Sequence, residues 1–204
     1  MKITLIGDSI RQQYAPRVRE LLGDGYEVWW PEENCRFAKY VQRGIFDWSR
    51  FMAGSDVVHF NVGLWDMCDL FGDGSFSTEE EYVSNVMRII DNLEGKYKKI
   101  IFATTTPVLP TNKFYRQGVT ERFNSIIVPR LLERGVIIND LYTPLGADKE
   151  RYLSEDGVHL SGEGIELAAS MVAESVRALE DGSSTEGADS PSQATDTTGA
   201  PVLI

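Results

Sequence analysis

The sequence predicts an α/β protein with a five-stranded parallel sheet, and three observations support that prediction. Short apolar runs typical of buried strands recur along the chain, helical patterns lie between them, and 42% of the 204 residues are hydrophobic. Strands that alternate with helices favour a parallel sheet, which helices cover on both faces through right-handed crossovers. A chain of this length can bury a substantial core in one domain. We therefore expect a single-domain, three-layer sandwich.

The elements follow from the apolar pattern. The expected strands are Ile3–Ile6, Tyr26–Trp30, Asp56–Val62, Lys99–Thr104 and Val136–Asn139. The expected helices, in which apolar side chains recur at helical spacing, are Gln12–Leu22, Glu79–Leu93, Val119–Arg134 and Ser161–Leu179. Pro129 falls inside the third helix and is expected to kink or split it. Five such strands suggest a flavodoxin-like sheet, which binds ligands beyond the carboxyl ends of its strands.

The composition changes after Glu180. Segment 181–204 is rich in Ser, Thr, Gly, Asp and Pro and contains almost no core-forming residues. Such a segment cannot bury enough apolar surface to fold, so it is predicted to be a disordered C-terminal tail. The folded domain is then expected to cover residues 1–180.

Charge and cysteine content restrict the partners. The net charge of −11 disfavours nucleic acid and anionic membranes as partners, since both attract positive surfaces. No stretch approaches the roughly 20 apolar residues needed to cross a bilayer, and the chain opens without a secretory-signal pattern. Cys35 and Cys68 form neither a metal-ligand nor a disulfide pattern. We expect a cytoplasmic protein with no metal and no organic cofactor, and make no prediction of its oligomeric state.

The first motif of chemical interest is Gly7-Asp8-Ser9-Ile10, directly after the first strand. A serine there lies at the carboxyl edge of the sheet, near the N–H groups of a helix N-terminus, which can stabilise an oxyanion. The structural alternative is that Asp8 and Ser9 only cap the helix.

The second motif is Asp156-Gly157-Val158-His159, just before the last helix. A serine hydroxyl needs a base to remove its proton, and that base needs a third group to hold its tautomer. An aspartate three residues before a histidine can do this across a tight loop, which Gly157 permits. The other histidine, His59, lies within a strand and is expected to be a buried core residue.

The third motif is Asn61-Val62-Gly63-Leu64-Trp65-Asp66, at the carboxyl end of the central strand. Asn61 or a nearby backbone N–H is a candidate donor to a tetrahedral oxyanion. The alternative for Asp66 is that it caps the short helix that follows.

With these motifs in this order, residues 1–180 resemble the SGNH (GDSL-type) hydrolases. The family has a G-D-S block, a glycine after the second strand, a G-x-N-D block and a C-terminal D-x-x-H block. Thr104-Thr105-Thr106-Pro107 and the segment from Gly135 to Tyr142 also look like segments common in the family. The resemblance implies that Ser9 is the nucleophile, His159 the base and Asp156 the orienting carboxylate. It also implies that the Ser9 backbone N–H is one oxyanion donor.

Two positions depart from the family pattern. Cys35 stands in place of the glycine of the second block, and its backbone N–H is a donor if the local angles allow. Trp65 stands in place of the oxyanion asparagine, and an indole is not an equivalent donor. Asn61 or Asn34 is the candidate substitute, and we favour Asn61. The predicted oxyanion and substrate-binding set is Asp8, Asn34, Cys35, Arg36, Asn61, Gly63 and Trp65.

Aromatic residues near the predicted edge of the sheet suit a sugar ring, and they are Trp29, Trp30, Trp48 and Trp65. Arg36 is a candidate ligand for a carboxylate or a sugar hydroxyl, or else a surface arginine bonded to its neighbours. The loop Leu109–Gly118 is expected to form one wall of the pocket. No long apolar channel is expected. The resemblance implies an esterase that removes small acyl groups, such as the acetyl groups that the family's carbohydrate esterases remove, from a small-molecule or oligosaccharide ester.

Three alternatives remain at this stage. The same triad would serve a thioesterase or a lysophospholipase with short-chain substrates. Trp65 in the asparagine's place would also fit a degenerate hydrolase that binds glycans without turnover. A nucleotide-binding doubly wound protein ranks last, because no glycine-rich phosphate loop follows the first strand.

Overall fold

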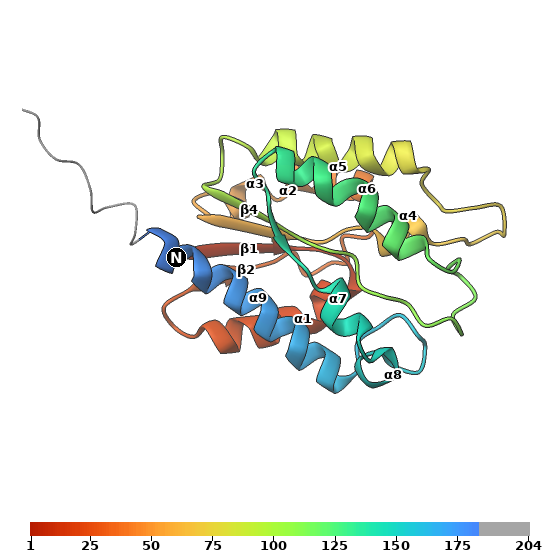
Figure 1. Cartoon of the computed structure of the whole chain (residues 1–204). Coiled ribbons are helices and arrows are strands. Elements are labelled where there is room, and N and C mark those ends of the chain that lie inside the picture. Colours follow the sequence, from red (N-terminus) through yellow and green to blue (C-terminus); the bar gives the residue numbers. More distant parts are fainter. Residues whose placement is uncertain (184–204) are drawn as a thin grey trace, which may run out of the picture.

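A parallel sheet of five strands lies between two layers of helices in the computed structural model, which describes residues 1–183 (Figure 1). The strands are β1 (Lys2–Ile6), β2 (Glu27–Trp29), β3 (Val57–Phe60), β4 (Lys99–Ala103) and β5 (Ile137–Asn139). Their order across the sheet is β2-β1-β3-β4-β5, and every neighbouring pair is parallel. This order is that of a doubly wound, flavodoxin-like sheet and confirms the predicted fold class.

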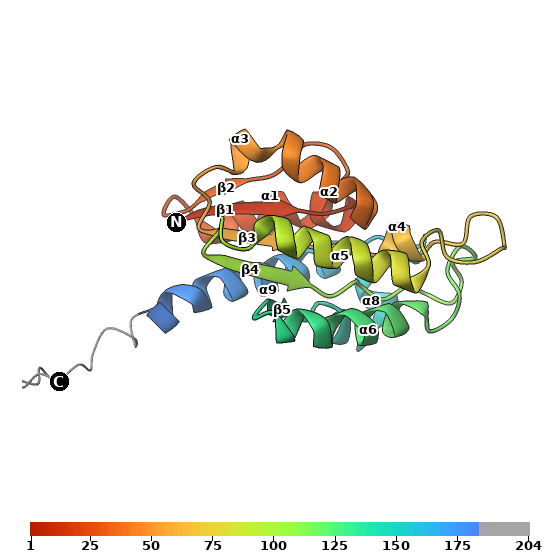
Figure 2. The ribbon, with the colours of Figure 1, turned by 90° about the horizontal axis from the view of Figure 1, so that it is seen from above.

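Nine helices are assigned within the described residues. They are α1 (Ser9–Leu22), α2 (Ala38–Asp47), α3 (Ser49–Met52), α4 (Leu64–Met67), α5 (Glu79–Leu93), α6 (Val119–Glu133), α7 (Tyr142–Gly146), α8 (Lys149–Tyr152) and α9 (Gly162–Ser183). One face of the sheet is covered by α1 and α9, and the other by α2, α5 and α6 (Figures 1 and 2). The predicted helices are all present. The sequence patterns missed α2 and the four helices of four or five residues, which are too short to show a period.

Pro129 lies inside α6, which continues without a break to Glu133, so the expected split of this helix is wrong. At the other end of the chain, α9 continues to Ser183, past the expected end at Leu179. Of the predicted disordered tail, residues 181–204, the first three residues belong to α9, and the part from residue 184 onward lies outside the described residues. Among the helices of residues 1–183, none is long and apolar enough to cross a membrane.

The alternation of side chains along the strands creates two cores, one on each face of the sheet. In β1, Ile3 and Leu5 belong to the core under α1 and α9, whereas Ile6 belongs to the core under α2 and α5. On that second face, the rings of Phe60 and Phe102 pack edge to face with centroids 5.2 Å apart. The sheet is therefore buried on both faces, as an all-parallel sheet requires.

His59 in β3 is fully buried, which confirms the prediction of a core histidine. Its Nε2 lies 3.2 Å from Nδ2 of Asn139 on β5. Burial lowers the pKa of His59 to about 3, so the imidazole is neutral near pH 7. It takes no part in the site described below.

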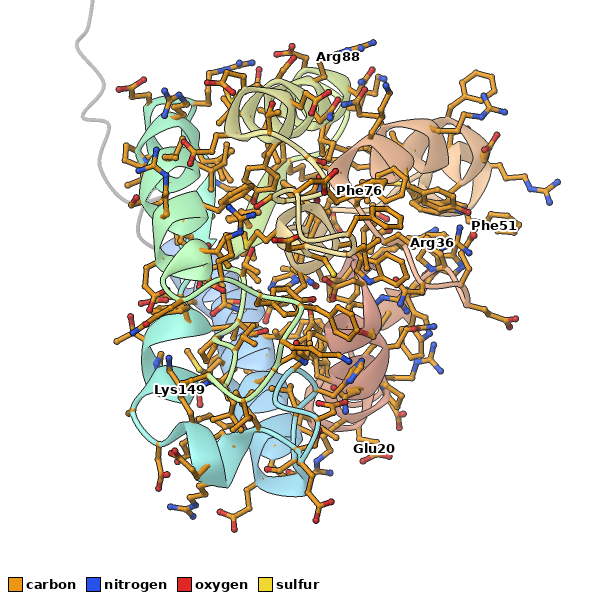
Figure 3. The ribbon with its side chains drawn as sticks, turned by 90° about the vertical axis from the view of Figure 1, so that its right-hand side faces the viewer. Glu20, Arg36, Phe51, Phe76, Arg88 and Lys149 are labelled. Carbon is orange, nitrogen blue, oxygen red and sulfur yellow. The ribbon has the colours of Figure 1, made fainter. Side chains whose placement is uncertain are left out.

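The carboxyl ends of the strands meet at one end of the molecule, which Figure 3 views directly. The chain leaves β1 toward β2 on one side and passes from β2 across β1 to β3 on the other, so the topological switch lies between β1 and β3. Doubly wound sheets bind their ligands at such a switch. A binding site is therefore expected at the loops after β1 and β3.

Gly7 permits a close approach of β1 to β3 at this switch. A Cβ at Gly7 would lie 2.1 Å from Oδ1 of Asn61 and 2.6 Å from Cβ of Arg11. Both neighbours are buried, so neither can move aside without disturbing the core.

We predict that Gly7→Ala lowers the free energy of unfolding by about 1–3 kcal/mol, the usual cost of overpacking. Urea denaturation measures this change. Gly25→Ala is the matched control, because a Cβ at Gly25 meets nothing within 4 Å. The control is expected to stay within about 0.5 kcal/mol of wild type. Equal denaturation midpoints for both variants would contradict the proposed close packing at Gly7.

Candidate active site

Ser9 occupies the first position of α1, immediately beyond the carboxyl end of β1. Asp8 forms the N-cap of this helix, and its Oδ1 accepts a hydrogen bond of 3.0 Å from the Ile10 N–H. Because the first N–H groups of a helix have no intrahelical acceptor, the Ser9 N–H is left available at the helix N-terminus. The sequence thus places a hydroxyl and a free backbone donor on the same residue.

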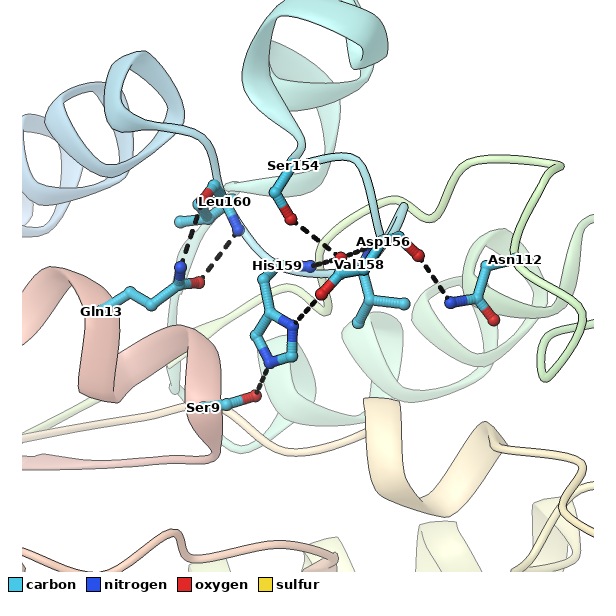
Figure 4. A network of polar contacts seen from close by, with 8 residues as sticks. All are labelled: Ser9, Gln13, Asn112, Ser154, Asp156, Val158, His159 and Leu160. Carbon is cyan, nitrogen blue, oxygen red and sulfur yellow. Dashed lines mark hydrogen bonds and ion pairs between the residues drawn. The ribbon is translucent and has the colours of Figure 1, made fainter.

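Ser9, His159 and Asp156 form a continuous chain of hydrogen bonds (Figure 4). Nε2 of His159 lies 2.9 Å from Oγ of Ser9, and Nδ1 lies 2.6 Å from Oδ2 of Asp156. An ionised carboxylate only accepts, so it fixes the imidazole proton on Nδ1 and leaves Nε2 as the acceptor for the Ser9 hydroxyl. The fold thereby brings together residues that lie 150 positions apart.

The loop that carries Asp156 and His159 is organised by the carboxylate itself. Oδ1 of Asp156 accepts from the Val158 N–H at 2.8 Å, from the His159 N–H at 2.9 Å and from the Ser154 hydroxyl at 2.9 Å. Gly157, with φ of 75°, supplies the left-handed turn that this wrapping needs. Partial burial acts to raise the pKa of Asp156, but the hydrogen bonds from His159 and Val158 outweigh it and hold the pKa well below its usual range.

Gln13 fixes this loop against the helix that carries Ser9 (Figure 4). Its Nε2 donates to the Leu160 carbonyl at 3.1 Å, and its Oε1 accepts from the Leu160 N–H at 2.9 Å. Gln13 lies one turn after Ser9 in α1, so a single helix positions both the hydroxyl and the residue next to His159. The sequence carried no signal for this role, because a glutamine on a helix is ordinarily a solvated residue.

We predict that Gln13→Ala slows the reaction of the Ser9 hydroxyl with a fluorophosphonate by about ten- to a hundredfold, since small misplacements of hydrogen-bonded groups that react together are costly. The substitution removes the two hydrogen bonds to Leu160 that hold His159 in position against Ser9. Gln12→Ala is the matched control, because Gln12 instead donates to the carbonyl of Glu32 at the surface. Equal reaction rates of the two variants, both folded by circular dichroism, would show that the contacts of Gln13 with Leu160 do not position His159 against Ser9.

The hydrogen-bonded chain opens into a pocket of about 380 Å³ with walls that are mainly apolar. The pocket is lined by Ser9, Asn34, Phe37, Leu64, Trp65, Cys68, Leu70, Phe76, Asn112, Phe114, Tyr115, Asp156, Val158 and His159. Asn112, Phe114 and Tyr115 belong to the loop Leu109–Gly118, which confirms that this loop forms a wall. The sequence predicted no long apolar channel, and the structure has instead a compact pocket whose walls are apolar.

A second wall comes from segment 68–77, which follows α4 and had been assigned no role. It contributes Cys68, Leu70 and Phe76, and Phe76 is labelled in Figure 3. Asp69 ties the two walls together: its N–H donates to the Phe114 carbonyl at 2.8 Å, and its Oδ2 pairs with Arg116 at 2.9 Å. The apolar residues of this segment were the one available signal, because exposed phenylalanines without helical or strand period are unusual.

Several residues of the predicted oxyanion set do not line the pocket. Asn61 donates from Nδ2 to Oδ1 of Asp8 at 2.9 Å, and its Oδ1 accepts from the Tyr14 hydroxyl at 3.1 Å. Asp8 and Asn61 are both buried, and each serves to hold the turn after β1. The favoured assignment of Asn61 as an oxyanion donor is therefore corrected to a structural one, because the core already uses its amide.

The second and third blocks need similar corrections. The Cys35 N–H donates to the Gly7 carbonyl at 3.1 Å, so it is not free to bind an oxyanion. The guanidinium of Arg36 is exposed and lies 5.2 Å from the Tyr40 ring centroid, away from the pocket lining. Gly63 has φ of 146°, and a Cβ there would lie 2.2 Å from Oγ1 of Thr105. This glycine is therefore needed for the conformation of the turn. Asn34 and Trp65 do line the pocket.

The four tryptophans differ in environment. Trp65 is 41% exposed at the pocket. Trp29 stacks on Phe51, Trp30 lies under the guanidinium of Arg19, and Trp48 is buried and donates to Glu33. Of the predicted sugar-stacking residues, only Trp65 is in position to touch a ligand in this pocket.

Asp66, in the segment that corresponds to the G-x-N-D block, joins α2 to segment 68–77. Its Oδ2 accepts from the Ala38 N–H at 3.0 Å, at the start of α2, and its Oδ1 accepts from the Ser77 hydroxyl at 2.8 Å. Burial raises the pKa of Asp66 to about 6, and the hydrogen bonds from Ala38 and Ser77 offset that rise only in part. The alternative that Asp66 merely caps a short helix is replaced by this bridge between α2 and segment 68–77.

A carboxyl group whose pKa is higher in the folded than in the unfolded protein stabilises the fold most at low pH. We predict that the Asp66 contribution is complete below about pH 4 and declines as the pH rises through about 6. In Asp66→Asn, the amide can still accept from Ala38 and donate to Ser77. Relative to wild type, this variant should therefore gain up to about 3 kcal/mol in unfolding free energy between pH 4 and pH 7. Urea denaturation at both pH values tests this, and a pH-independent difference would contradict it.

No protein-family model matches the chain, and no curated protein sequence matches it. Solved structures do match. The acetyl xylan esterase AlAXEase is 19% identical with a TM-score of 0.75, over 86% of this chain and all (100%) of that one. A lipase/acylhydrolase from Enterococcus faecalis is 17% identical with a TM-score of 0.73, over 87% of this chain and 95% of that one.

A single-residue variant of an acetyl-xylooligosaccharide esterase from Geobacillus is 15% identical, with a TM-score of 0.69, over 85% of this chain and 92% of that one. A GDSL-like lipase from Bacteroides thetaiotaomicron matches at 16% identity with a TM-score of 0.69, over 87% of this chain and 88% of that one. The chain therefore has the fold of the SGNH (GDSL-type) hydrolases, as its motifs suggested. At this identity the likeness concerns the fold, and the chemistry has to be argued from the site.

Proposed function

We propose that the protein is a serine ester hydrolase in which Ser9 is the nucleophile, His159 the general base and Asp156 the residue that orients it. One observation carries this proposal: Oγ of Ser9 lies 2.9 Å from a histidine whose other nitrogen lies 2.6 Å from a carboxylate. This is the arrangement in which a serine hydroxyl becomes a nucleophile without a metal or an organic cofactor. Ser9 lines a pocket of about 380 Å³, which gives an ester access to it.

The proposed reaction has two half-reactions. The Ser9 hydroxyl loses its proton to Nε2 of His159 as Oγ bonds to the ester carbonyl carbon, and the carbonyl electrons form an oxyanion. Collapse of this intermediate breaks the bond to the alcohol oxygen, which leaves with the proton from His159. Water then attacks the acyl-Ser9 ester by the same route, which releases the carboxylic acid and restores the hydroxyl. Asp156 stays ionised throughout and stabilises the imidazolium.

For the substrate, we propose small acyl esters, with O-acetyl groups on carbohydrate as the first candidate. Two matched structures of the same fold are an acetyl xylan esterase and an acetyl-xylooligosaccharide esterase. The exposed rings of Trp65, Phe76 and Phe114 at the pocket also suit the apolar face of a sugar.

A second candidate, a thioesterase or lysophospholipase-type acyl hydrolase, is favoured by the apolar walls. Asn112 already donates to the Asp156 carbonyl and accepts from the Phe114 N–H, so it offers little to sugar hydroxyls. An acyl chain of several carbons would bury more apolar surface in this pocket than an acetyl group can. The non-catalytic glycan-binding alternative has less support, because the triad residues lie within hydrogen-bonding distance.

The test compares wild type with Ser9→Ala on p-nitrophenyl acetate, acetylated xylo-oligosaccharides and p-nitrophenyl octanoate. We expect hydrolysis by wild type and a loss of about 10³-fold or more in the variant, because the nucleophile is gone. The ratio of kcat/KM among the three substrates separates the carbohydrate esterase from the longer-chain hydrolase. Hydrolysis that survives in Ser9→Ala would overturn the proposed mechanism.

A further inference from the structure

The proposed mechanism requires a second oxyanion donor beside the Ser9 N–H, and two of the residues expected to supply it, Cys35 and Asn61, are engaged elsewhere. The Cys35 N–H donates to the Gly7 carbonyl, and the Asn61 amide donates to Asp8. Trp65 replaces the asparagine of the third block. A hydrolase with one donor missing would lose about a hundred- to a thousandfold in rate. The missing donor is therefore expected among the pocket-lining residues, as an amide or N–H that no protein acceptor uses.

Asn34 lies in a segment that is tied to both sides of Ser9. The residue before it, Glu33, accepts a hydrogen bond of 2.6 Å on its carbonyl from Nη2 of Arg11, two positions after Ser9. The residue after it, Cys35, donates its N–H to Gly7, two positions before Ser9. These bonds hold the backbone on each side of Asn34 against the β1–α1 turn. Asn34 and Ser9 line the same pocket.

The orientation of the Asn34 side chain is fixed by its own loop. Its Oδ1 accepts a hydrogen bond of 2.8 Å from the Arg36 N–H. This bond accompanies a left-handed backbone at Arg36, whose φ of 51° makes it the single non-glycine residue with positive φ in the described part of the chain. Such strain is uncommon and tends to occur where a fold holds a functional group in place. Because Oδ1 faces the Arg36 N–H, the amide oxygen and nitrogen are distinguished from each other.

The amide nitrogen of Asn34 is then the free end of the side chain. Within residues 1–183 it has no hydrogen-bond acceptor, although the residue is partly buried and lines the same pocket as Ser9 and His159. Asn112, the other asparagine of the lining, has both its oxygen and its nitrogen engaged. A preorganised N–H that nothing else uses is what stabilises a developing negative charge at low cost.

We propose that Asn34 is a catalytic residue: its Nδ2 donates, with the Ser9 N–H, to the oxyanion of the tetrahedral intermediate, in place of the asparagine that Trp65 replaces. The inference rests on the serine mechanism proposed above. In this arrangement the side-chain donor comes from the loop after β2, whereas in the family pattern it comes from the third block, after β3. Arg36 is a positioning residue that acts through its backbone N–H.

The test uses two variants, because each removes the donor in a different way. Asn34→Asp keeps the oxygen that accepts from Arg36 but loses the NH2 group. Asn34→Ala adds no charge but loses the turn bond as well. We expect both to lower kcat for p-nitrophenyl acetate by about a hundred- to a thousandfold, with KM within a few-fold of wild type. Both should also react more slowly with a fluorophosphonate, in which Oγ of Ser9 displaces fluoride through a negatively charged phosphoryl oxygen.

Asn92→Ala is the matched control, because Asn92 lies on α5 and donates to the Arg88 carbonyl within that helix. Activity of Asn34→Asp within about threefold of this control would overturn the inference. A loss in Asn34→Ala alone would assign Asn34 to the turn, and a loss in Asn34→Asp alone would assign the effect to charge; both outcomes overturn a donor role. A large loss in Trp65→Phe with the Asn34 variants unaffected would transfer the role to the indole.

The same experiment separates this inference from the proposed function. Wild type that fails to react with the fluorophosphonate, while folded, would overturn the serine mechanism itself. Wild type that reacts at Ser9, together with Asn34 variants that react equally fast, would overturn only the assignment of Asn34.

Discussion

The buried guanidinium of Arg11 is the constraint on which the rest of the site depends. Arg11 is 1% exposed, and Nη2 donates to the Gly7 carbonyl at 3.1 Å and to the Glu33 carbonyl at 2.6 Å. Its charge also opposes the rise that burial causes in the pKa of neighbouring Asp8, which still reaches about 6. A buried charge is tolerated only when such partners surround it. The turn after β1 and the loop after β2 are thereby held together around Ser9.

Helix α1, which carries Arg11, also positions the loop that contains His159. Ser9 begins the helix, and Gln13, one turn later, clamps the backbone beside His159. The loop around Asp156 needs little further support, because its carboxylate binds its own backbone N–H groups. The Ser9 hydroxyl and the His159 imidazole are therefore both positioned from α1, and a site built on a helix holds its geometry more precisely than one built on loops.

The pocket combines a few polar residues, among them Ser9 and His159, with mainly apolar walls, and this contrast has two consequences. Apolar walls lower the local dielectric, so that donors aimed at a developing oxyanion act more strongly than they would in water. In the proposed reaction, the walls would also restrict which ester groups gain from binding, because most polar atoms of the lining are already paired. The tie from Asp69 to Arg116 and to the Phe114 carbonyl holds the two walls in register, so the pocket is largely preformed.

The sequence by itself determined the fold class, all five strands and the longer helices other than α2, because periodicity and apolar runs are local properties. It also located Ser9, Asp156 and His159, since their motifs are local as well. Tertiary structure alone decided the hydrogen-bond partners of these side chains. The Asn61 amide could donate to an oxyanion, yet it is bonded to Asp8 and Tyr14. Likewise Gln13 and segment 68–77 act through residues distant in sequence. Hydrogen-bond partners depend on which loops meet at the end of the sheet, and only the packed fold fixes that.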